Sequence, residues 1–463
     1  MKFRLSEILE WTGGKLLAST VESSLSFGDI GIDSRKSKAG ELFIAIRGRR
    51  FDGHDYLAQA FRKGVKAALV SKIPEGFSRD SNLKDAVLIK VKDTVRALQD
   101  ISAHYRRKFK LKVIAVTGSN GKTTTKDLIA HILQTKFSVL KSAGNFNNQI
   151  GIPLSLLRIK EYHQLAVLEL GASALGEIKL LSRLVQPHFG IITNISPAHL
   201  EFFGTLDNVA KAKAELIESL DKEGVVFLNN DDPYLGRMKN KIRGEFATFA
   251  IKEKADFQAR NIAFVNFSNS TFKINGQIEV SLPLLGRHNI YNALAASAVA
   301  RTLDISWDSI KSALADFSPP PMRMEVKETG GLKVINDAYN ANPYSVKAAV
   351  ESLLNLKSRG RKILVLGDML ELGDSTRYFH RQLGEEIGAS GIDYLLTVGD
   401  FSRFTAKGAR RSGMADKYIF HSDSIKDVLS VLKNIVKKED ILLIKGSRAM
   451  KLERIIEGIN HAL

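Results

Sequence analysis

The sequence predicts an α/β protein with three parts: a small α/β N-terminal domain at residues 1–107, a central domain with a doubly wound parallel sheet at 108–316, and a Rossmann-like α/β domain at 317–463. Short apolar runs alternate with helical patterns along most of the chain, which is typical of parallel sheets. A length of 463 residues suits two to four domains. Three consecutive prolines, Pro319 to Pro321, cannot lie inside a helix or a central strand, so they mark the last boundary.

The composition is that of a globular protein without thiol chemistry. Hydrophobic residues make up 44% of the chain and charged residues 25%, which is ordinary for a protein with packed cores. There is no cysteine, so disulfides and thiolate metal sites are excluded, and oxygen or imidazole must hold any metal. No apolar run has the length of a signal-peptide core or a membrane span, so we expect a cytoplasmic protein without membrane insertion.

The net charge of +18 favours anionic partners, but it does not choose among nucleotides, nucleic acid and acidic metabolites. Basic residues are mostly dispersed, with two local clusters at 47–50 and 106–108. Neither cluster is interleaved with aromatic residues in the manner of a single-strand binding platform. We therefore expect both clusters to be solvated surface, and we expect no nucleic-acid partner.

The first 107 residues contain short apolar runs between polar loops. A helix is expected near 5–9 and a strand at 42–46. The loops carry Ser34, Arg35, Gly53 and His54, and such residues beside strand ends are well placed to hold an anion. Taken alone, these four residues are more typical of a surface loop than of a site.

A phosphate-binding loop is the strongest local signal in the chain. The apolar run 113–116 predicts a buried strand, and a helical pattern begins after the loop. Gly118 and Gly121 allow a tight turn in which backbone N–H groups point at phosphate oxygens, beside the positive end of the helix. Lys122 would reach the outer phosphates, and the Thr123 hydroxyl would hold Mg²⁺.

This loop departs from the full GxxxxGK[ST] pattern, because Val116 stands where the first glycine belongs. The shorter GxxGKT remains. An ordinary strand-to-helix turn is the alternative interpretation, and the flanking strand and helix favour the phosphate loop over it.

Further polar groups follow the central strands. The loop 143–149 holds four amide side chains, more than a turn needs, although asparagine in turns often serves only the backbone. Glu169 ends the next apolar run, where a carboxylate beside a phosphate loop can take Mg²⁺. His199 follows another strand, and Lys211 and Lys213 lie on a helical pattern. These residues are candidates for a cation-dependent phosphate site.

The second half of the chain predicts more strands and one notable helix. Residues 251–281 alternate weakly, which indicates strands, and an alanine-rich helix follows. Asn289 and Asn292 lie on one face of that helix and could contact a base edge, or could simply form a polar helix start. No GxGxxG occurs in the C-terminal part, so a dinucleotide site there has little support. Its predicted parallel strands lie at 332–337, 362–368, 393–400 and 440–447.

The order of these motifs resembles that of the Mur ligases of bacterial cell-wall synthesis. The central stretches TGSNGKTT, ELGAS, SPAHLEFFGT and KAKAE and the later GRHNIYNALAA carry the resemblance, which covers essentially the whole chain. Within the family, the resemblance is greatest to the members that add D-alanyl-D-alanine. It rests there on DSR, GELFIAIRGRRFDGHDY, GNFNNQIGIPLSLL, PPPMRME, NDAYNANPYS and GDMLELG. The DNPR motif of the sister enzyme that adds the third residue is absent.

The resemblance implies roles for individual residues. Lys122, Glu169, His199 and Lys213 would be the catalytic residues. Thr123 and Glu169 would hold one Mg²⁺, and Glu169, His199 and Lys213, as a carbamate, the second. Family alignment by eye favours Lys213 over Lys211. The residues implied to bind ATP are Gly118, Ser119, Asn120, Gly121, Lys122, Thr123, Thr124, Asn289, Asn292, Arg323 and Asp337.

For the second substrate, the resemblance implies that Ser34, Arg35, Asn147 and Asn148 hold a UDP-sugar. Lys445 and Arg448 would contact a substrate carboxylate.

The activity implied by the resemblance is ATP-dependent amide ligation. D-alanyl-D-alanine would be joined to UDP-N-acetylmuramoyl-tripeptide through an acyl phosphate, with release of ADP and phosphate, in cytoplasmic peptidoglycan precursor synthesis. Two Mg²⁺ ions and Lys122 would offset charge on the transferring phosphoryl group. Domain closure would assemble the site and exclude water. We expect a monomer. The residues leave lysine and diaminopimelate open as the third residue of the tripeptide.

Three alternatives stand beside this interpretation. The nearest is another amide ligase of the same superfamily, such as the third-residue-adding Mur ligase or folylpolyglutamate synthetase. A basic, nucleic-acid-dependent ATPase is supported by the charge and the phosphate loop, and a steeply salt-dependent affinity for DNA or RNA would favour it. A non-catalytic binding module would leave Lys122, Glu169, His199 and Lys213 without a task.

Overall fold

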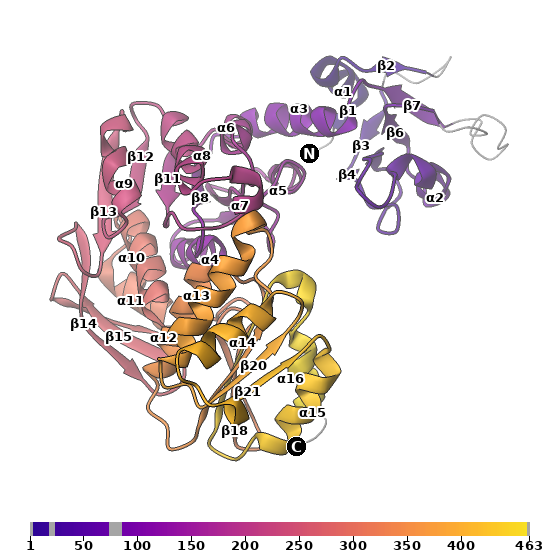
Figure 1. Ribbon diagram of the computed structural model, residues 1–463. Helices are drawn as coiled ribbons and strands as arrows, with labels where there is room; N and C mark the ends of the chain where they lie inside the picture. The colour runs from indigo at the N-terminus through magenta and orange to yellow at the C-terminus, as the bar shows by residue number, and fades with distance from the viewer. Residues whose placement is uncertain (1–2, 18–23, 74–85, 461–463) are drawn as a thin grey trace.

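The protein contains three α/β regions, each with its own sheet, in a computed structural model that describes residues 3–17, 24–73 and 86–460 (Figure 1). The predicted α/β fold class is confirmed. The N-terminal region stands away from the other two, and helix α3 (Thr94–Arg107) connects it to them (Figure 1). The boundaries at 107/108 and 316/317 stay predictions; helix α11 (Trp307–Ala315) ends just before the second one.

The N-terminal region is built on a small five-stranded sheet. Its order is β2-β7-β6-β5-β4, and all neighbours are parallel except β2 and β7. A separate antiparallel pair joins β1 (Phe3–Arg4) to β3 (Ser26–Phe27). The five strands are β2 (Lys15–Leu16), β4 (Ile30–Gly31), β5 (Leu42–Ile44), β6 (Ala67–Val70) and β7 (Val87–Lys90), and the helices are α1 (Leu5–Thr12) and α2 (Leu57–Arg62).

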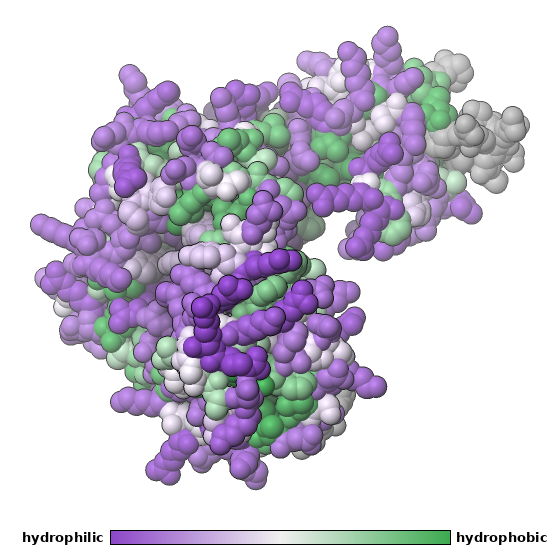
Figure 2. Space-filling view, viewed as in Figure 1, coloured by the Kyte–Doolittle hydropathy of each residue, from purple (hydrophilic) through white to green (hydrophobic). Residues whose placement is uncertain are grey.

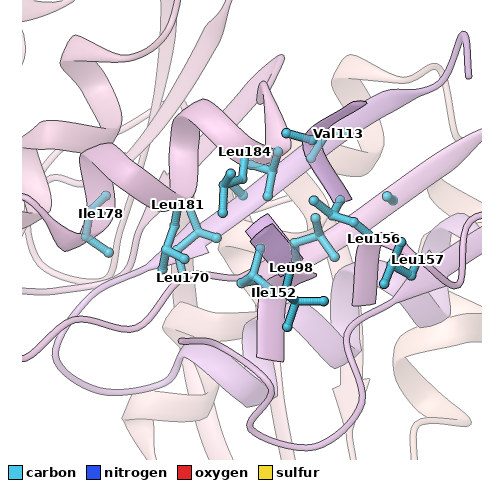
Figure 3. Close-up of a cluster of buried hydrophobic side chains, with 14 of the residues drawn as sticks. Leu98, Val113, Ile152, Leu156, Leu157, Leu170, Ile178, Leu181 and Leu184 are labelled. Atoms are coloured by element: carbon cyan, nitrogen blue, oxygen red, sulfur yellow. The ribbon is translucent and has the colours of Figure 1, made fainter. Parts of the chain in front are cut away.

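Helix α3 is fixed to the central region by apolar packing and by one buried arginine. Leu98 of α3 lies among leucine, isoleucine and valine side chains from the central strands and helices (Figure 3). The guanidinium of Arg106 donates hydrogen bonds to the backbone oxygens of Val185, Phe109 and Leu111 at 3.0–3.2 Å. The expectation that the basic cluster at 106–108 is solvated is therefore wrong for Arg106, which is buried because it satisfies these carbonyls.

The central sheet has nine strands in the order β16-β15-β14-β13-β12-β11-β8-β10-β9. Strands β8 to β14 pair in parallel, and β15 and β16 add an antiparallel edge, which confirms the expected parallel sheet and the strands predicted at 251–281. The strands are β8 (Lys112–Thr117), β9 (Val139–Lys141), β10 (Leu165–Glu169), β11 (Phe189–Ile192), β12 (Val225–Asn229), β13 (Glu245–Ala250), β14 (Phe257–Val265), β15 (Asn269–Ile274) and β16 (Ile278–Leu282).

Helices cover both faces of this sheet. The alanine-rich helix α10 is almost entirely buried and packs against α4, because its small side chains permit close approach. The central helices are α4 (Lys122–Leu133), α5 (Gly151–Leu156), α6 (Glu177–Val185), α7 (Leu200–Phe203), α8 (Leu206–Glu218), α9 (Pro233–Met238), α10 (Arg287–Thr302) and α11.

The C-terminal region is a six-stranded sheet in the order β17-β18-β22-β19-β20-β21, parallel except for β17 and β18. The four predicted strands are present. The edge strands β17 and β21 escaped prediction because β17 is mostly polar and the short β21 is only partly buried. The elements are β17 (Glu325–Thr329), β18 (Leu332–Asp337), β19 (Lys362–Gly367), β20 (Tyr394–Val398), β21 (Ile419–Ser422), β22 (Ile441–Lys445), α12 (Pro343–Leu354), α13 (Thr376–Gly388), α14 (Ser402–Arg411), α15 (Ile425–Ile435) and α16 (Glu453–Asn460).

Loops that follow parallel strands of both large sheets meet in one place. Loops after β8, β10 and β11 of the central sheet face loops after β18, β19 and β22 of the C-terminal sheet. Ligands of open α/β sheets bind beyond the carboxyl ends of the strands, so this junction is where a site is expected. The face in Figure 2 is mostly hydrophilic, with smaller hydrophobic areas. No helix among the described residues is long and apolar enough to cross a bilayer.

Candidate active site

A cavity of about 980 Å³ occupies the junction, and all three regions contribute to its lining. Most of the predicted site residues line it. Lys213, Gly118, Ser34 and Arg35 do not. The predicted residues that line it are Ser119, Asn120, Gly121, Lys122, Thr123, Thr124, Asn147, Asn148, Glu169, His199, Asn289, Asn292, Arg323, Asp337, Lys445 and Arg448.

The phosphate loop has the local geometry that its glycines allow. Gly118 and Gly121 have φ angles of 139° and 81°. A Cβ on Gly118 would lie 2.0 Å from Thr193 Oγ1, so both backbone conformation and space exclude a side chain. Lys122 is the first residue of α4, and its Nζ donates to the backbone oxygens of Gly118 and Ser119 at 2.8 and 3.0 Å. The ammonium thus lies over the loop that would cradle phosphate.

Glu169 is the centre of a buried polar network. Its Oε2 accepts a hydrogen bond from Thr123 Oγ1 at 2.7 Å, and its Oε1 accepts one from Asn147 Nδ2 at 2.8 Å. Arg323, from the segment after the three prolines, donates to Thr123 Oγ1 at 3.0 Å. Burial lowers the pKa of the Lys122 ammonium, an effect that Glu169 opposes and Arg323 adds to.

The oxygen atoms of this network suit a hard cation. Mg²⁺ prefers carboxylate and hydroxyl oxygens and takes its remaining ligands from water and substrate phosphates. Among the described residues, no group of three His, Cys, Asp or Glu side chains could hold a metal ion by itself. The Glu169 and Thr123 pair therefore fits Mg²⁺ only if nucleotide, water or a modified side chain completes the coordination.

Lys213 lies within α8 and is only 2% exposed, whereas Lys211 on the same helix is exposed. Its Nζ lies 5.6 Å from the centroid of the Phe203 ring. Burial, with a further contribution from the Lys122 charge, lowers the pKa of Lys213 to about 7. The Lys213 amine is then uncharged in a substantial share of the molecules near neutral pH, and only an uncharged amine can add CO₂ to form a carbamate.

His199 connects the central region to the C-terminal one. It has a left-handed φ of 55° just before α7. Its Nδ1 lies 2.5 Å from Oε2 of Glu371, and the imidazole lowers the pKa of that carboxyl group. Arg49 also acts on Glu371, so groups from all three regions meet here. Glu371 belongs to the GDMLELG stretch, but sequence reasoning assigned it no role.

Asn289 and Asn292 line the cavity, but their amides already have protein partners. Asn289 Nδ2 donates to the Leu285 oxygen at 2.7 Å, and Asn292 Nδ2 donates to Asn289 Oδ1 at 3.0 Å. Thr125 Oγ1 donates to Asn292 Oδ1 at 3.0 Å. These bonds tie α10 to the phosphate-loop helix, which favours a supporting role over direct reading of a base edge.

The C-terminal region contributes polar side chains to the cavity, and one of them contacts the phosphate loop. Asp337 Oδ2 lies 2.5 Å from Lys445 Nζ, so these two predicted ligand contacts are paired with each other. Arg448 is paired with Glu453 at 2.7 Å. Asn342 Nδ2 donates to Asn120 Oδ1 at 2.8 Å, a contact that sequence reasoning missed.

The structure places the predicted UDP-sugar residues of the N-terminal region outside the cavity. Ser34 is buried and donates to Gln59 Oε1 at 2.7 Å, and Arg35 is paired with Asp33 at 2.9 Å. Arg47 and Arg49 line the cavity instead. Both are exposed, as expected for a solvated cluster, and the turn that follows β5 also brings them to the edge of the cavity.

Aromatic residues that line the cavity also escaped sequence reasoning. Phe249, Tyr291 and Tyr344 line the cavity with the partly buried His288. Burial lowers the pKa of His288 to about 4, so its imidazole is neutral at physiological pH. These side chains come from separate elements, so no local pattern in the sequence could have grouped them.

Comparisons with known proteins agree with this arrangement. Three family descriptions match consecutive parts of the chain: "Mur ligase family, catalytic domain" at residues 27–106, "Mur ligase middle domain" at 116–300 and "Mur ligase, glutamate ligase domain" at 322–448. The UDP-N-acetylmuramoyl-tripeptide–D-alanyl-D-alanine ligases of Bacillus subtilis and Escherichia coli are 39% and 35% identical to the chain. In each case the match covers 99% of this chain and 98% of the relative.

Solved structures share the architecture over nearly the whole length. MurF from Acinetobacter baumannii has a TM-score of 0.90 at 31% identity, and the match covers 100% of this chain and 99% of that one. MurF ligase from Thermotoga maritima, solved in complex with ADP, has a TM-score of 0.82 at 30% identity, with 94% and 97% covered. With three consecutive domain matches and full-length relatives above 30% identity, the chain belongs to the Mur ligase family.

Proposed function

We propose that this protein is an ATP-dependent ligase that joins D-alanyl-D-alanine to UDP-N-acetylmuramoyl-tripeptide in cytoplasmic peptidoglycan precursor synthesis. The observation that carries the proposal is the Thr123 hydroxyl, which lies next to Lys122 in the chain, donates to Glu169 and accepts from Arg323 at a cavity lined by all three regions. Full-length relatives whose names state this activity support the choice of substrates.

The reaction has two steps that the cavity can accommodate. A carboxylate oxygen of the tripeptide attacks the γ-phosphorus of ATP, and the bond to the ADP oxygen breaks, which gives an acyl phosphate and ADP. The amine nitrogen of D-alanyl-D-alanine then attacks the acyl carbon, phosphate leaves, and the amine loses a proton. Since a free carboxylate is a poor electrophile, the first step is what makes amide formation possible. Activation comes from ATP, so the reaction requires no nucleophilic side chain of the protein.

The residues of the cavity have separable tasks in this scheme. The phosphate loop orients the nucleotide through its backbone N–H groups, and the Lys122 ammonium offsets negative charge on the outer phosphates. Glu169 and Thr123 would hold one Mg²⁺, and Glu169, His199 and carbamylated Lys213 would hold the second. When bound, these ions supply charge neutralisation between two anionic reactants. Closure of the three regions around the cavity would keep water from the acyl phosphate.

The proposed function includes a carbamylated Lys213, which can be tested separately. It is supported by the burial of Lys213 and by its pKa of about 7, which makes the amine available to CO₂. We expect Lys213→Ala to lose ligation and to regain part of it when a short carboxylic acid is added. Lys211→Ala, at an exposed position of the same helix, is the control and should keep full activity. A wild-type level of ligation by Lys213→Ala without added acid would contradict the role of Lys213.

Phosphate release from ATP tests the function directly. It is measured with UDP-N-acetylmuramoyl-tripeptide, in its lysine and diaminopimelate forms, with and without D-alanyl-D-alanine. Release that requires both substrates supports the proposal and names the tripeptide. Hydrolysis of ATP without dependence on the dipeptide would reject it in favour of another amide ligase of the superfamily, and single amino acids and folates would then be screened. Light scattering of the same sample tests the predicted monomer.

A further inference from the structure

Lys126 is a buried lysine that has no role in the proposed reaction. It lies in α4 one turn after Lys122, is only 1% exposed, and does not line the cavity. A buried lysine is costly unless its charge is matched by well-placed acceptors. Burial lowers its pKa, while Asp127 and Glu169 act in the opposite direction.

Its hydrogen-bond acceptors lie in the amide loop, defined as residues 143–149, and at the residue before it, and Asp127 Oδ1 is an ion-pair partner at 3.5 Å. Lys126 Nζ donates to the backbone oxygen of Ser142 at 2.9 Å and to that of Gly144 at 3.2 Å. Gly144 has a φ of 49°, a left-handed conformation that turns the chain at this point. One ammonium group therefore fixes the first turn of the loop to the phosphate-loop helix.

The same loop is attached to the catalytic network at its other side. Asn147 donates from its side chain to Glu169, and its backbone oxygen accepts a hydrogen bond from Gly171 at 2.8 Å. Ser142 Oγ accepts a hydrogen bond from the Glu169 backbone N–H at 3.2 Å. Asn148 Oδ1 accepts from the backbone N–H groups of Ile150 and Gly151, which directs the loop into α5. The loop is thus held between Lys126 and Glu169.

The charge of Lys126 is better explained by the position of the loop than by stability of the fold. A methionine has similar length and would fill much of the same volume, and apolar replacements of buried charges are often neutral or stabilising. The two loop carbonyls would nevertheless lose their donor. We propose that Lys126 is a positioning residue that sets the amide loop for binding of the nucleotide-sugar substrate. This inference rests on the proposed function, in which Asn147 and Asn148 face that substrate.

Steady-state kinetics of Lys126→Met separate this role from a structural one. We expect the KM for UDP-N-acetylmuramoyl-tripeptide to rise on the order of tenfold or more, the effect of losing charge-assisted hydrogen bonds. The KM for ATP, the kcat at saturation and the thermal unfolding temperature should stay close to those of the wild type. The matched control is Lys136→Met, which removes an exposed lysine just after the same helix that also donates to two backbone oxygens, those of Leu303 and Asp304, and should leave every parameter unchanged.

Amide hydrogen exchange gives a second readout that does not depend on the substrate. Residues 143–149 should exchange faster in Lys126→Met, while α4 and α10 keep their protection. If the wild type failed to act on the dipeptide, the proposed function would fail, but the exchange result would still report on the loop. An unchanged substrate KM together with unchanged exchange would overturn the inference. Loss of folded protein in both Lys126→Met and Lys126→Gln would also overturn it, because Lys126 would then serve stability.

Discussion

Replacement of Lys213 by methionine should make the protein more stable while it abolishes ligation. Burial moves the pKa of Lys213 from 10.5 to about 7. At about 1.4 kcal/mol for each pH unit between the two pKa values, the buried amine costs about 4 kcal/mol of folding free energy at pH 7. Methionine carries no charge and packs in a similar volume, so Lys213→Met should recover a large part of this energy.

The sign of the pH dependence follows from proton binding. Between about pH 7 and pH 10.5 the unfolded chain holds a proton on Lys213 that the folded protein has released, so wild-type stability rises with pH through this window. Below pH 7 both states bind the proton and the full cost is present. The stability advantage of Lys213→Met should therefore be greatest at or below pH 7 and should shrink as the pH approaches 10.

Urea denaturation in bicarbonate-free buffer measures this difference. Wild type and Lys213→Met are compared at pH 6.5, 8 and 9.5, with Lys211→Met as the control for an exposed lysine of the same helix. Because three regions unfold in one chain, the transition is followed with a probe in the central region. A variant less stable than wild type at pH 6.5, or an advantage that does not change with pH, would refute the assignment of Lys213 as a buried amine with a lowered pKa.

Three further outcomes follow from the geometry. Lys122→Ala should abolish ligation and leave far-UV circular dichroism unchanged, because in the proposed function its ammonium contacts the phosphates, and in the structure it makes only local contacts with the loop. Gly118→Ala should weaken ADP binding, measured by calorimetry, on the order of tenfold or more, since a Cβ would lie 2.0 Å from Thr193 Oγ1 at a φ of 139°. Gly408→Ala should lower the free energy of unfolding of the C-terminal region by about 1–3 kcal/mol, because its Cβ would lie 2.2 Å from the Arg381 backbone oxygen where α13 and α14 pack closely.

One control serves both glycine variants. Gly236→Ala places a Cβ where no neighbouring atom lies within 4 Å, at an ordinary φ inside α9, and should leave ADP affinity unchanged and raise stability by no more than about 1 kcal/mol. Wild-type ADP affinity in Gly118→Ala would contradict the tight phosphate loop. Full ligation by Lys122→Ala would remove the basis of the nucleotide assignment, and an unchanged unfolding midpoint for Gly408→Ala would contradict the close packing of the two helices.

Local patterns predicted the parts of the fold that depend on neighbouring residues. The buried strands of both large sheets were visible as apolar runs because a strand covered on both faces has no polar side. The edge strands β17 and β21 lacked this signal, since their side chains are only partly buried. The phosphate loop was visible because its glycines, lysine and threonines follow one another in the chain.

The burial and the contacts of charged side chains were the features that local sequence predicted least well. The clusters at 47–50 and 106–108 are both runs of basic residues, but Arg106 is buried against backbone carbonyls and Arg49 faces the cavity. Whether a charged side chain is buried or exposed depends on the groups that other helices, strands and loops place around it. Ser34 and Arg35 are the opposite case. Their DSR motif was recognised in the sequence as part of a binding site, but the tertiary structure places both residues outside the cavity.

The sequence by itself determined the fold class, the phosphate loop, the metal-suited oxygen chemistry without thiolates, and the resemblance to the Mur ligases, because each depends on residue types in a local order. Only the tertiary structure decided which groups from separate regions act together. Arg323 reaches Thr123 across 200 positions of chain, and Glu371 meets His199 across the junction of two regions. Such contacts arise from the packing of whole sheets against each other, and no periodicity within one segment specifies them.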